Sequence, residues 1–304
     1  MRTNQCGWAA LASAALASLL TSHAAAQGAP QFTILPVRAA AVTMVSINNR
    51  DRRMTVGSRV QSNESGEGRL VGFALQDRFL DPIDFQDAGN ILLTGHNDRG
   101  EIVGLLNQSD GTEFGFRYSL GKLNPIIIAG SSLPASPQDI NNNGDVVGWV
   151  QFLSPISEPG FLLSGGQLTL IVPPDAQRNT GTRAWGINDK REIVGSYTAA
   201  GIGDRGFLFR NGAYTVIHVP DARATFPFDI NKWGTIVGSY TDAAFDTHGF
   251  VLRAGRFTTI DIPNSVSTAV GSINDNGDIV GVFVTNTSVS RTFRSNVSEF
   301  IAQN

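Results

Sequence analysis

The residues best placed for metal chemistry lie in a short polar turn near the end of the chain. Four oxygen-bearing side chains follow one another closely there: Asn274, Asp275, Asn276 and Asp278. Carboxylate and amide oxygens at this spacing are ligands of the kind that Ca²⁺ takes in proteins. The distal glutamate that completes an EF-hand loop is absent.

The same turn recurs along the chain with different charges, which favours a structural role. Residues 188–192 read Asn-Asp-Lys-Arg-Glu and residues 231–235 read Asn-Lys-Trp-Gly-Thr, so the two copies would not hold the same ion. Asparagine can hydrogen-bond to its own backbone, and glycine accepts the positive φ that tight hairpins need. We therefore expect a hairpin turn and no resident cofactor, with Ca²⁺ in one or two copies as the alternative.

A second set of candidate residues places aromatic rings and charged groups near the longer connections of the chain. The set comprises Arg183, Trp185, Arg205, Arg223, Phe228, Asp242 and His248. Functional residues gather on the longer loops of a rigid scaffold, so this set predicts a binding face for a sugar or a peptide. Trp185 and Phe228 each stand three residues before a turn asparagine, on a strand expected to line a central channel. The alternative is an ordinary solvated loop surface.

Signatures of catalysis are scarce in the sequence. His96, His218 and His248 fall in different repeats and at different positions within the repeat, and neither His-Glu-x-x-His nor Gly-x-Ser-x-Gly occurs. The single cysteine, Cys6, lies in the N-terminal segment, so disulfides and thiolate chemistry are excluded from the rest of the chain. Histidines from different repeats would have to meet in space to form an active site.

The elements that position these residues are copies of one repeat. Ile273–Gly281 reads Ile-Asn-Asp-Asn-Gly-Asp-Ile-Val-Gly, and variants of it recur along the chain. The asparagine at its second position recurs at intervals of 43 to 49 residues, as Asn48, Asn97, Asn141, Asn188, Asn231 and Asn274. A period in this range is typical of propellers and solenoids.

Each repeat carries four short stretches with strand character. In one copy they are residues 235–240, 249–253, 257–263 and 269–273, rich in β-branched and aromatic residues and separated by turns. Four antiparallel strands per period predict an all-β chain folded as a six-bladed β-propeller, with a β-solenoid as the alternative. Residues 31–36 resemble one such strand alone, and we expect them to close the ring between the first and last blades.

The repeat resembles the HAF-repeat family of probable extracellular, mainly bacterial proteins. The resemblance rests on the Ile-Asn-Asp-x-Gly-Asp-Ile-Val-Gly turn, a following Gly-Phe-Leu and a Phe-Thr-x-Ile-Asp-x-Pro strand. It covers residues 27–304 and implies a repeat protein outside the cytoplasm, without naming an activity. His248 matches the histidine of the family's His-Ala-Phe motif, whereas Phe114, Pro159 and Arg205 stand there in other copies.

The N-terminus predicts export. Residues 1–26 combine Arg2, a short apolar stretch and a closing Ala-Ala-Ala, which is the pattern of a secretory signal peptide. Residues 27–304 would then form a single secreted or periplasmic domain, which we expect to be monomeric. The formal net charge is −3, so no nucleic-acid partner is expected. Integral membrane association is not expected either, because no later stretch reaches membrane-spanning length.

Together these patterns favour a secreted, non-catalytic binding or scaffolding module. Its partner would be a carbohydrate, a cell-envelope component or a protein. The alternative is a propeller enzyme, a lyase or hydrolase, with its site over the central channel. A pocket with three or more convergent polar groups would favour the enzyme, and a flat aromatic patch would favour binding.

Overall fold

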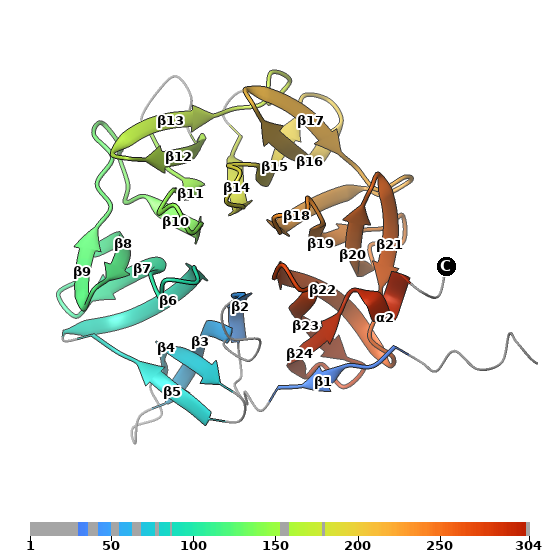
Figure 1. Cartoon of the computed structure of the whole chain (residues 1–304), viewed down its shortest axis with the longest axis horizontal. Coiled ribbons are helices and arrows are strands. Elements are labelled where there is room, and N and C mark those ends of the chain that lie inside the picture. Colours follow the sequence, from blue (N-terminus) through green and yellow to red (C-terminus); the bar gives the residue numbers. More distant parts are fainter. Residues whose placement is uncertain are drawn as a thin grey trace, which may run out of the picture.

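The computed structural model describes residues 30–35, 42–49, 55–62, 68–76, 79–85, 87–152, 158–177 and 180–301. The expected signal peptide at residues 1–26 lies outside them. The described chain is built of β-strands and one helical turn, α2 (Ser298–Ile301). The strands are arranged as blades around a centre, with the first strand of each blade innermost (Figure 1).

Sixteen strands form four separate antiparallel sheets of four strands each. The first two sheets comprise β2 (Val42–Ile47), β3 (Thr55–Ser62), β4 (Gly68–Gln76) and β5 (Phe79–Ile83), and then β6 (Ala88–His96), β7 (Ile102–Gln108), β8 (Glu113–Ser119) and β9 (Lys122–Pro125). The next two comprise β10 (Ser136–Ile140), β11 (Val146–Trp149), β12 (Gly160–Ser164) and β13 (Gln167–Ile171), and then β14 (Thr182–Ile187), β15 (Ile193–Ala199), β16 (Gly203–Arg210) and β17 (Ala213–Ile217).

The remaining eight strands share one sheet. They are β18 (Ala224–Ile230), β19 (Ile236–Thr241), β20 (Thr247–Arg253), β21 (Arg256–Ile260), β22 (Ser265–Ile273), β23 (Asp278–Thr285), β24 (Ser290–Asn296) and β1 (Thr33–Ile34). A single parallel bridge between Thr247 and Ser267 joins β20 to β22. The predicted β-propeller is therefore observed, but with four separate blades and one joint eight-stranded sheet in place of six separate blades.

The two ends of the described chain meet in that sheet. Strand β1 pairs antiparallel with β24, with Thr33 opposite Arg294 and Ile34 opposite Phe293. Phe32 packs against the core of the last strands, and Leu35 packs against the core beside the first sheet. This confirms the prediction that residues 31–36 close the ring between its first and last strands (Figure 1).

The hydrophobic core lies between neighbouring sheets. The third strand of each repeat contributes one phenylalanine that is at most 1% exposed, and it packs against branched aliphatic residues of the adjacent sheet. Burying a side chain of this size contributes about 2–3 kcal/mol. The six are Phe73, Phe116, Phe161, Phe207, Phe250 and Phe293.

The repeated asparagine bonds each blade to the next around the centre. In Asn231, Oδ1 accepts the N–H groups of Trp233 and Thr235 and so closes its own turn, while Nδ2 donates to the carbonyl of Asn274 in the following repeat. All six asparagines are buried. These side-chain to carbonyl hydrogen bonds run in sequence from Asn97 to Asn141, Asn188, Asn231, Asn274 and finally Asn48, with lengths of 2.9–3.1 Å.

The Ile-Val-Gly end of the motif has its own structural reason. Opposite its glycine, the innermost strand of each repeat carries a β-bulge, which brings two backbones close together. A Cβ atom on Gly195 would lie 2.1 Å from the carbonyl oxygen of Arg183, and one on Gly238 would lie 2.1 Å from that of Phe226. Only glycine fits this approach, so the motif specifies the bulge.

We expect Gly238→Ala to lower the free energy of unfolding by about 3 kcal/mol, because the new methyl group meets backbone that cannot move. Gly212→Ala is the control, since its Cβ would meet nothing within 4 Å and only its positive φ of 79° opposes alanine. That strain costs about 1 kcal/mol. Urea denaturation measures both values, and equal losses would contradict the crowding argument.

We expect Asn231→Ala to cost about 2–4 kcal/mol, because it leaves two N–H donors and one carbonyl without their buried partner. Asn143→Ala is the matched control, since Asn143 is exposed and its side chain donates a hydrogen bond to the carbonyl of Asp189. Thermal unfolding compares the two variants. A loss at Asn231 no larger than at Asn143 would show that the interblade bond is dispensable.

Candidate functional site

The bulges turn one residue per blade toward the central channel. In five repeats the bulged residue stands three positions before the turn asparagine, and all five line a cavity of about 360 Å³. They are Thr94, Gln138, Trp185, Phe228 and Gly271. A bulge commonly re-aims a side chain beside a functional site. We call this cavity the channel pocket.

Two aromatic rings form one wall of the channel pocket. Trp185 and Phe228 come from neighbouring blades and meet edge to face, with ring centroids 5.9 Å apart and an interplanar angle of 82°. The indole N–H of Trp185 donates to the Ser196 hydroxyl at 2.8 Å, which holds the ring in place. The prediction that these two residues line the channel is confirmed by their position.

The floor of the channel pocket is polar. It consists of Ser46, Asp139, Asp229 and Ser272, each two residues before a turn asparagine, and these four also border a smaller cavity of about 70 Å³ on the asparagine side. The other two blades carry glycine at this position. A Cβ atom on Gly95 would lie 2.7 Å from Cα of Asp139, so that glycine leaves room for the neighbouring acid.

The floor residues also join the blades. Asp139 accepts the Ile187 N–H at 2.9 Å, and Asp229 accepts the Ile273 N–H at 2.9 Å. Ser272 accepts the equivalent N–H of Ile47 at 3.2 Å. Because serine supports the same interblade bond, the bond does not require a carboxyl group. The two acids therefore bring charge to the channel that the fold itself does not need.

Position in the channel shifts the acid–base behaviour of both acids. Burial raises the pKa of Asp139 well above its ordinary value, and the nearby Asp229 carboxyl raises it further. Burial also raises the pKa of Asp229, although hydrogen bonds from Ser272 and from the Ile273 N–H act in the opposite direction. Both carboxyls are half-buried at the pocket, and this burial makes their ionisation costly.

His96 lies on the asparagine side of the floor, where it lines the smaller cavity. Its Nδ1 is 3.0 Å from the Ser46 hydroxyl, and its buried Nε2 has no hydrogen-bond partner. Burial lowers its pKa to about 4, despite the opposing charge of Asp98. The imidazole is therefore neutral at pH 7.

The structure separates the other predicted loop residues from the channel pocket. Arg183 pairs with Glu158 and lies over the Trp149 ring at 4.1 Å. Arg205 donates to the Arg223 carbonyl, and the Arg223 guanidinium lies 3.9 Å from the Phe245 ring centroid. None of these three arginines lines the channel pocket.

Asp242 and His248 form a second local group. His248 Nδ1 lies 2.9 Å from Asp261, its Nε2 lies 3.5 Å from Asp242, and its ring stacks on Tyr240 at 5.1 Å. Burial alone would lower the pKa of His248, but Asp261 and Asp242 together raise it. Asp242 also accepts the backbone N–H groups of Ala244 and Asp246, so it shapes its own loop.

The oxygens of the candidate calcium turn are engaged by the protein. Asn274 Oδ1 accepts the N–H groups of Asn276 and Asp278, and Asp275 Oδ1 accepts that of Lys232. Within the described ranges, no three His, Cys, Asp or Glu side chains gather as a metal site would require. These hydrogen bonds give the turn a structural role, and calcium binding stays a prediction.

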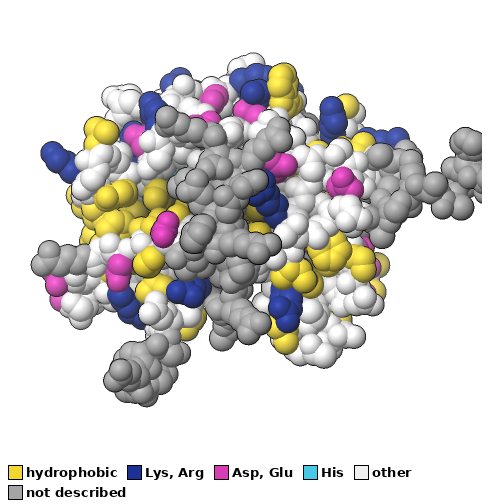
Figure 2. Space-filling view, turned by 60° about the horizontal axis from the view of Figure 1, so that its bottom comes forward, with side chains coloured by type: hydrophobic (Ala, Val, Ile, Leu, Met, Phe, Trp, Pro, Cys, Tyr) yellow, Lys and Arg dark blue, Asp and Glu magenta, His cyan; other side chains and the backbone are white. Residues whose placement is uncertain are grey.

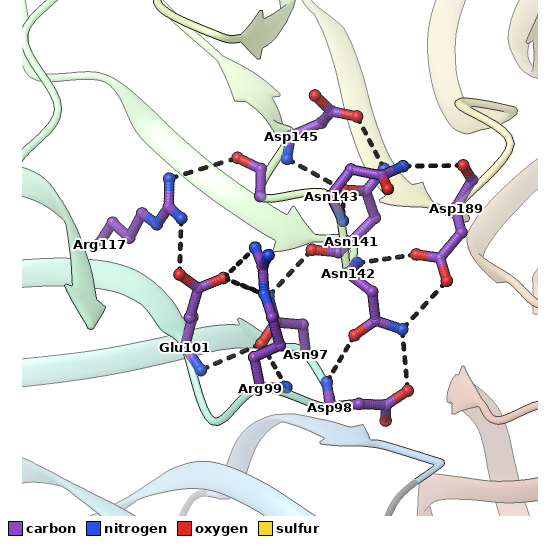
Figure 3. A network of polar contacts seen from close by, with 11 residues as sticks. Asn97, Asp98, Arg99, Glu101, Arg117, Asn141, Asn142, Asn143, Asp145 and Asp189 are labelled. Atoms are coloured by element: carbon purple, nitrogen blue, oxygen red, sulfur yellow. Dashed lines mark hydrogen bonds and ion pairs between the residues drawn. The ribbon is translucent and has the colours of Figure 1, made fainter. Parts of the chain in front are cut away.

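In neighbouring turns, the residue directly after the turn asparagine also takes part in hydrogen bonds between repeats. Asp98 donates its N–H to the side chain of Asn142, and Asn142 donates its own to Asp189 (Figure 3). In the same network, the Glu101 carboxylate accepts hydrogen bonds from the guanidinium groups of Arg99 and Arg117. Asp98 and Asp189 thus bond to the adjacent repeat, whereas Glu101 is held by arginines of its own blade.

Sequence reasoning missed the acids of the floor. Asp139 and Asp229 stand where other repeats carry glycine or serine. A charged residue at one repeat position that is otherwise small was the available signal. The enclosing surface is mixed in charge, since Figure 2 shows Lys and Arg interspersed with Asp and Glu on the face it presents.

Fold and site together define a β-propeller with a pocket in its channel. No known family model and no curated protein matches its sequence. Among the described residues, no helix has the length and apolar character needed to cross a membrane.

Solved β-propellers share the fold at low sequence identity. The β-propeller domain of the Trilobed protease from Pyrococcus furiosus matches with a TM-score of 0.55 and 8% identity, over 85% of this chain and 93% of that one. TolB from Acinetobacter baumannii matches at 0.54 and 12%, over 82% and 65%. A gluconolactonase from Xanthomonas campestris matches at 0.52 and 14%, over 88% and 89%. These identities show the fold alone.

We expect Asp139→Asn to raise the melting temperature at pH 7. A folded-state pKa above the unfolded value means that ionisation costs stability as pH rises above about 3.9, and asparagine keeps an acceptor for the Ile187 N–H without that cost. The gain should shrink as pH falls towards this value and be absent below it. Asp81→Asn on the outermost strand β5 is the control, and an unchanged or lower melting temperature for Asp139→Asn would contradict the argument.

Proposed function

We propose that this chain is a secreted or periplasmic, non-catalytic binding module whose channel pocket holds a carbohydrate ring. The observation that carries the proposal is the wall formed by Trp185 and Phe228 above the polar floor of Asp139 and Asp229. A sugar ring has apolar C–H faces and polar edges, so it suits a site that offers an aromatic surface and nearby oxygen acceptors. The signal-peptide pattern of residues 1–26 supports export.

The proposed ring has six blades. The eight-stranded sheet holds two copies of the repeat, β18–β21 and β22–β24 with β1, that are joined by one bridge. The regular asparagine links across it support counting them as two blades. Under this proposal, protein or cell-envelope partners would reach the channel from the face that carries the longer loops. The resemblance to the HAF-repeat family stays a prediction.

A second function is favoured by the acids themselves. Gln138, Asp139 and Asp229 converge on one pocket, and burial raises the pKa of Asp139, which favours the protonated carboxyl. A lyase or hydrolase could use that proton as a general acid, and a gluconolactonase shares the fold. Turnover separates the two proposals, because the binding module returns its ligand unchanged and the enzyme does not.

The test of the binding proposal is a thermal melt across a panel of monosaccharides, since a ligand of the folded state must raise the melting temperature. We expect Trp185→Ala to weaken the binding of any sugar found this way by about thirtyfold, the loss typical of a central aromatic contact worth about 2 kcal/mol. Trp233→Ala is the matched control, because Trp233 is 70% exposed and does not line the pocket. Equal affinities of the two variants would place the sugar elsewhere.

A further inference from the structure

The unsatisfied polar group of the channel pocket is an acceptor. Gln138 is only 5% exposed, and its buried Oε1 has no hydrogen-bond partner. Its Nε2 lies 2.9 Å from the Ser136 hydroxyl and 3.4 Å from the Ser136 carbonyl. A carbonyl oxygen can only accept, so the contact with the Ser136 carbonyl fixes the orientation of the amide. Oε1 is then a buried acceptor without a donor.

The donors around the pocket are already engaged. The Trp185 indole N–H donates to Ser196, and the Ser272 hydroxyl donates to Asp229 at 2.6 Å. The Thr94 hydroxyl lies 2.9 Å from the carbonyl of Pro137. A ligand that needs to accept hydrogen bonds therefore finds these donors committed, whereas a ligand that donates finds Gln138 and the floor carboxyls.

The charge of the pocket points the same way. Asp139 and Asp229 lie on the floor, and among the described residues that line the pocket there is no lysine, arginine or histidine. The rings of Trp185 and Phe228 add π faces, which attract cations. Burial raises the pKa values of both acids, and the Asp229 carboxyl raises that of Asp139 further, as expected where a counter-charge is missing.

We propose that the channel pocket recognises a primary ammonium group. An ammonium group carries three N–H donors, no acceptor and one positive charge, which complements the Gln138 carbonyl, the Asp139 and Asp229 carboxyls and the aromatic wall. A quaternary ammonium satisfies the charge but leaves Gln138 without a donor. This inference rests on the proposed function, and combined with it identifies the ligand as an amino sugar.

The test is isothermal titration calorimetry of the full chain with matched ligands. Glucosamine carries the ammonium group, glucose lacks it, and N-acetylglucosamine replaces it with a neutral amide. We expect glucosamine to bind at least about tenfold more tightly than either neutral sugar, which is the scale of a close charge pair away from solvent. n-Butylammonium and tetramethylammonium separate recognition of the N–H donors from recognition of charge alone.

Asp139→Asn is the decisive variant, because it removes the charge and keeps the acceptor that bonds Ile187. It should weaken glucosamine binding about tenfold or more and so remove the preference for glucosamine over glucose. Asp81→Asn, exposed on β5, should alter neither. The melting temperature of each variant verifies that it is folded. Gln138→Met provides a second variant that removes the unsatisfied carbonyl together with the amide nitrogen that contacts Ser136.

The outcomes separate this inference from the proposed function. Equal binding of glucose and glucosamine would overturn the ammonium inference and leave the sugar site standing. Binding of n-butylammonium but of no sugar, with loss in Asp139→Asn, would support the ammonium site and overturn the carbohydrate proposal. Tetramethylammonium bound as tightly as n-butylammonium would refute the role of Gln138. No binding by any of these ligands would refute both.

Discussion

The hydrogen bond from one turn asparagine to the carbonyl of the next is the constraint on which the rest of this protein depends. It is buried, so breaking it would leave a donor and an acceptor unsatisfied in the protein interior. It also runs between repeats, and the link from Asn274 to Asn48 joins segments 226 residues apart. Each blade is therefore fixed in depth and angle against its neighbours, and the strand that precedes the asparagine is held at the channel.

That fixed strand explains how repeats with the same backbone can carry different residues at the channel. The Ile-Val-Gly stretch forces a bulge opposite its glycine, and the bulge directs one side chain per blade inward. No neighbouring side chain dictates the identity of that residue, so Thr94, Gln138, Trp185 and Phe228 differ while their backbones agree. At the floor, either serine or aspartate can accept the interblade hydrogen bond. Aspartate adds a charge whose burial costs stability.

The candidate site was predictable in part. The position of Trp185 and Phe228 followed from their spacing before the turn asparagine, because a strand that leads into an inner turn must line the channel. Arg205, Arg223 and His248 were grouped with them on the argument that long loops share a face, yet each is held by partners away from the channel pocket. Sharing a face brings loops to the same side of a ring without bringing their side chains to one point.

The sequence by itself determined the repeat, the four-strand unit and the structural meaning of Asn and Gly in the turn, because these depend on local backbone preferences and on a period visible in one dimension. It also carried the closing role of residues 31–36, through their likeness to a strand that lacked a blade. Only the tertiary structure decided that Asp139 and Asp229 share one floor, that Gln138 keeps an unpaired carbonyl, and that one bridge merges the last eight strands. Those facts depend on distances between residues that the chain separates by roughly one or two whole repeats, and closure of the ring sets these distances.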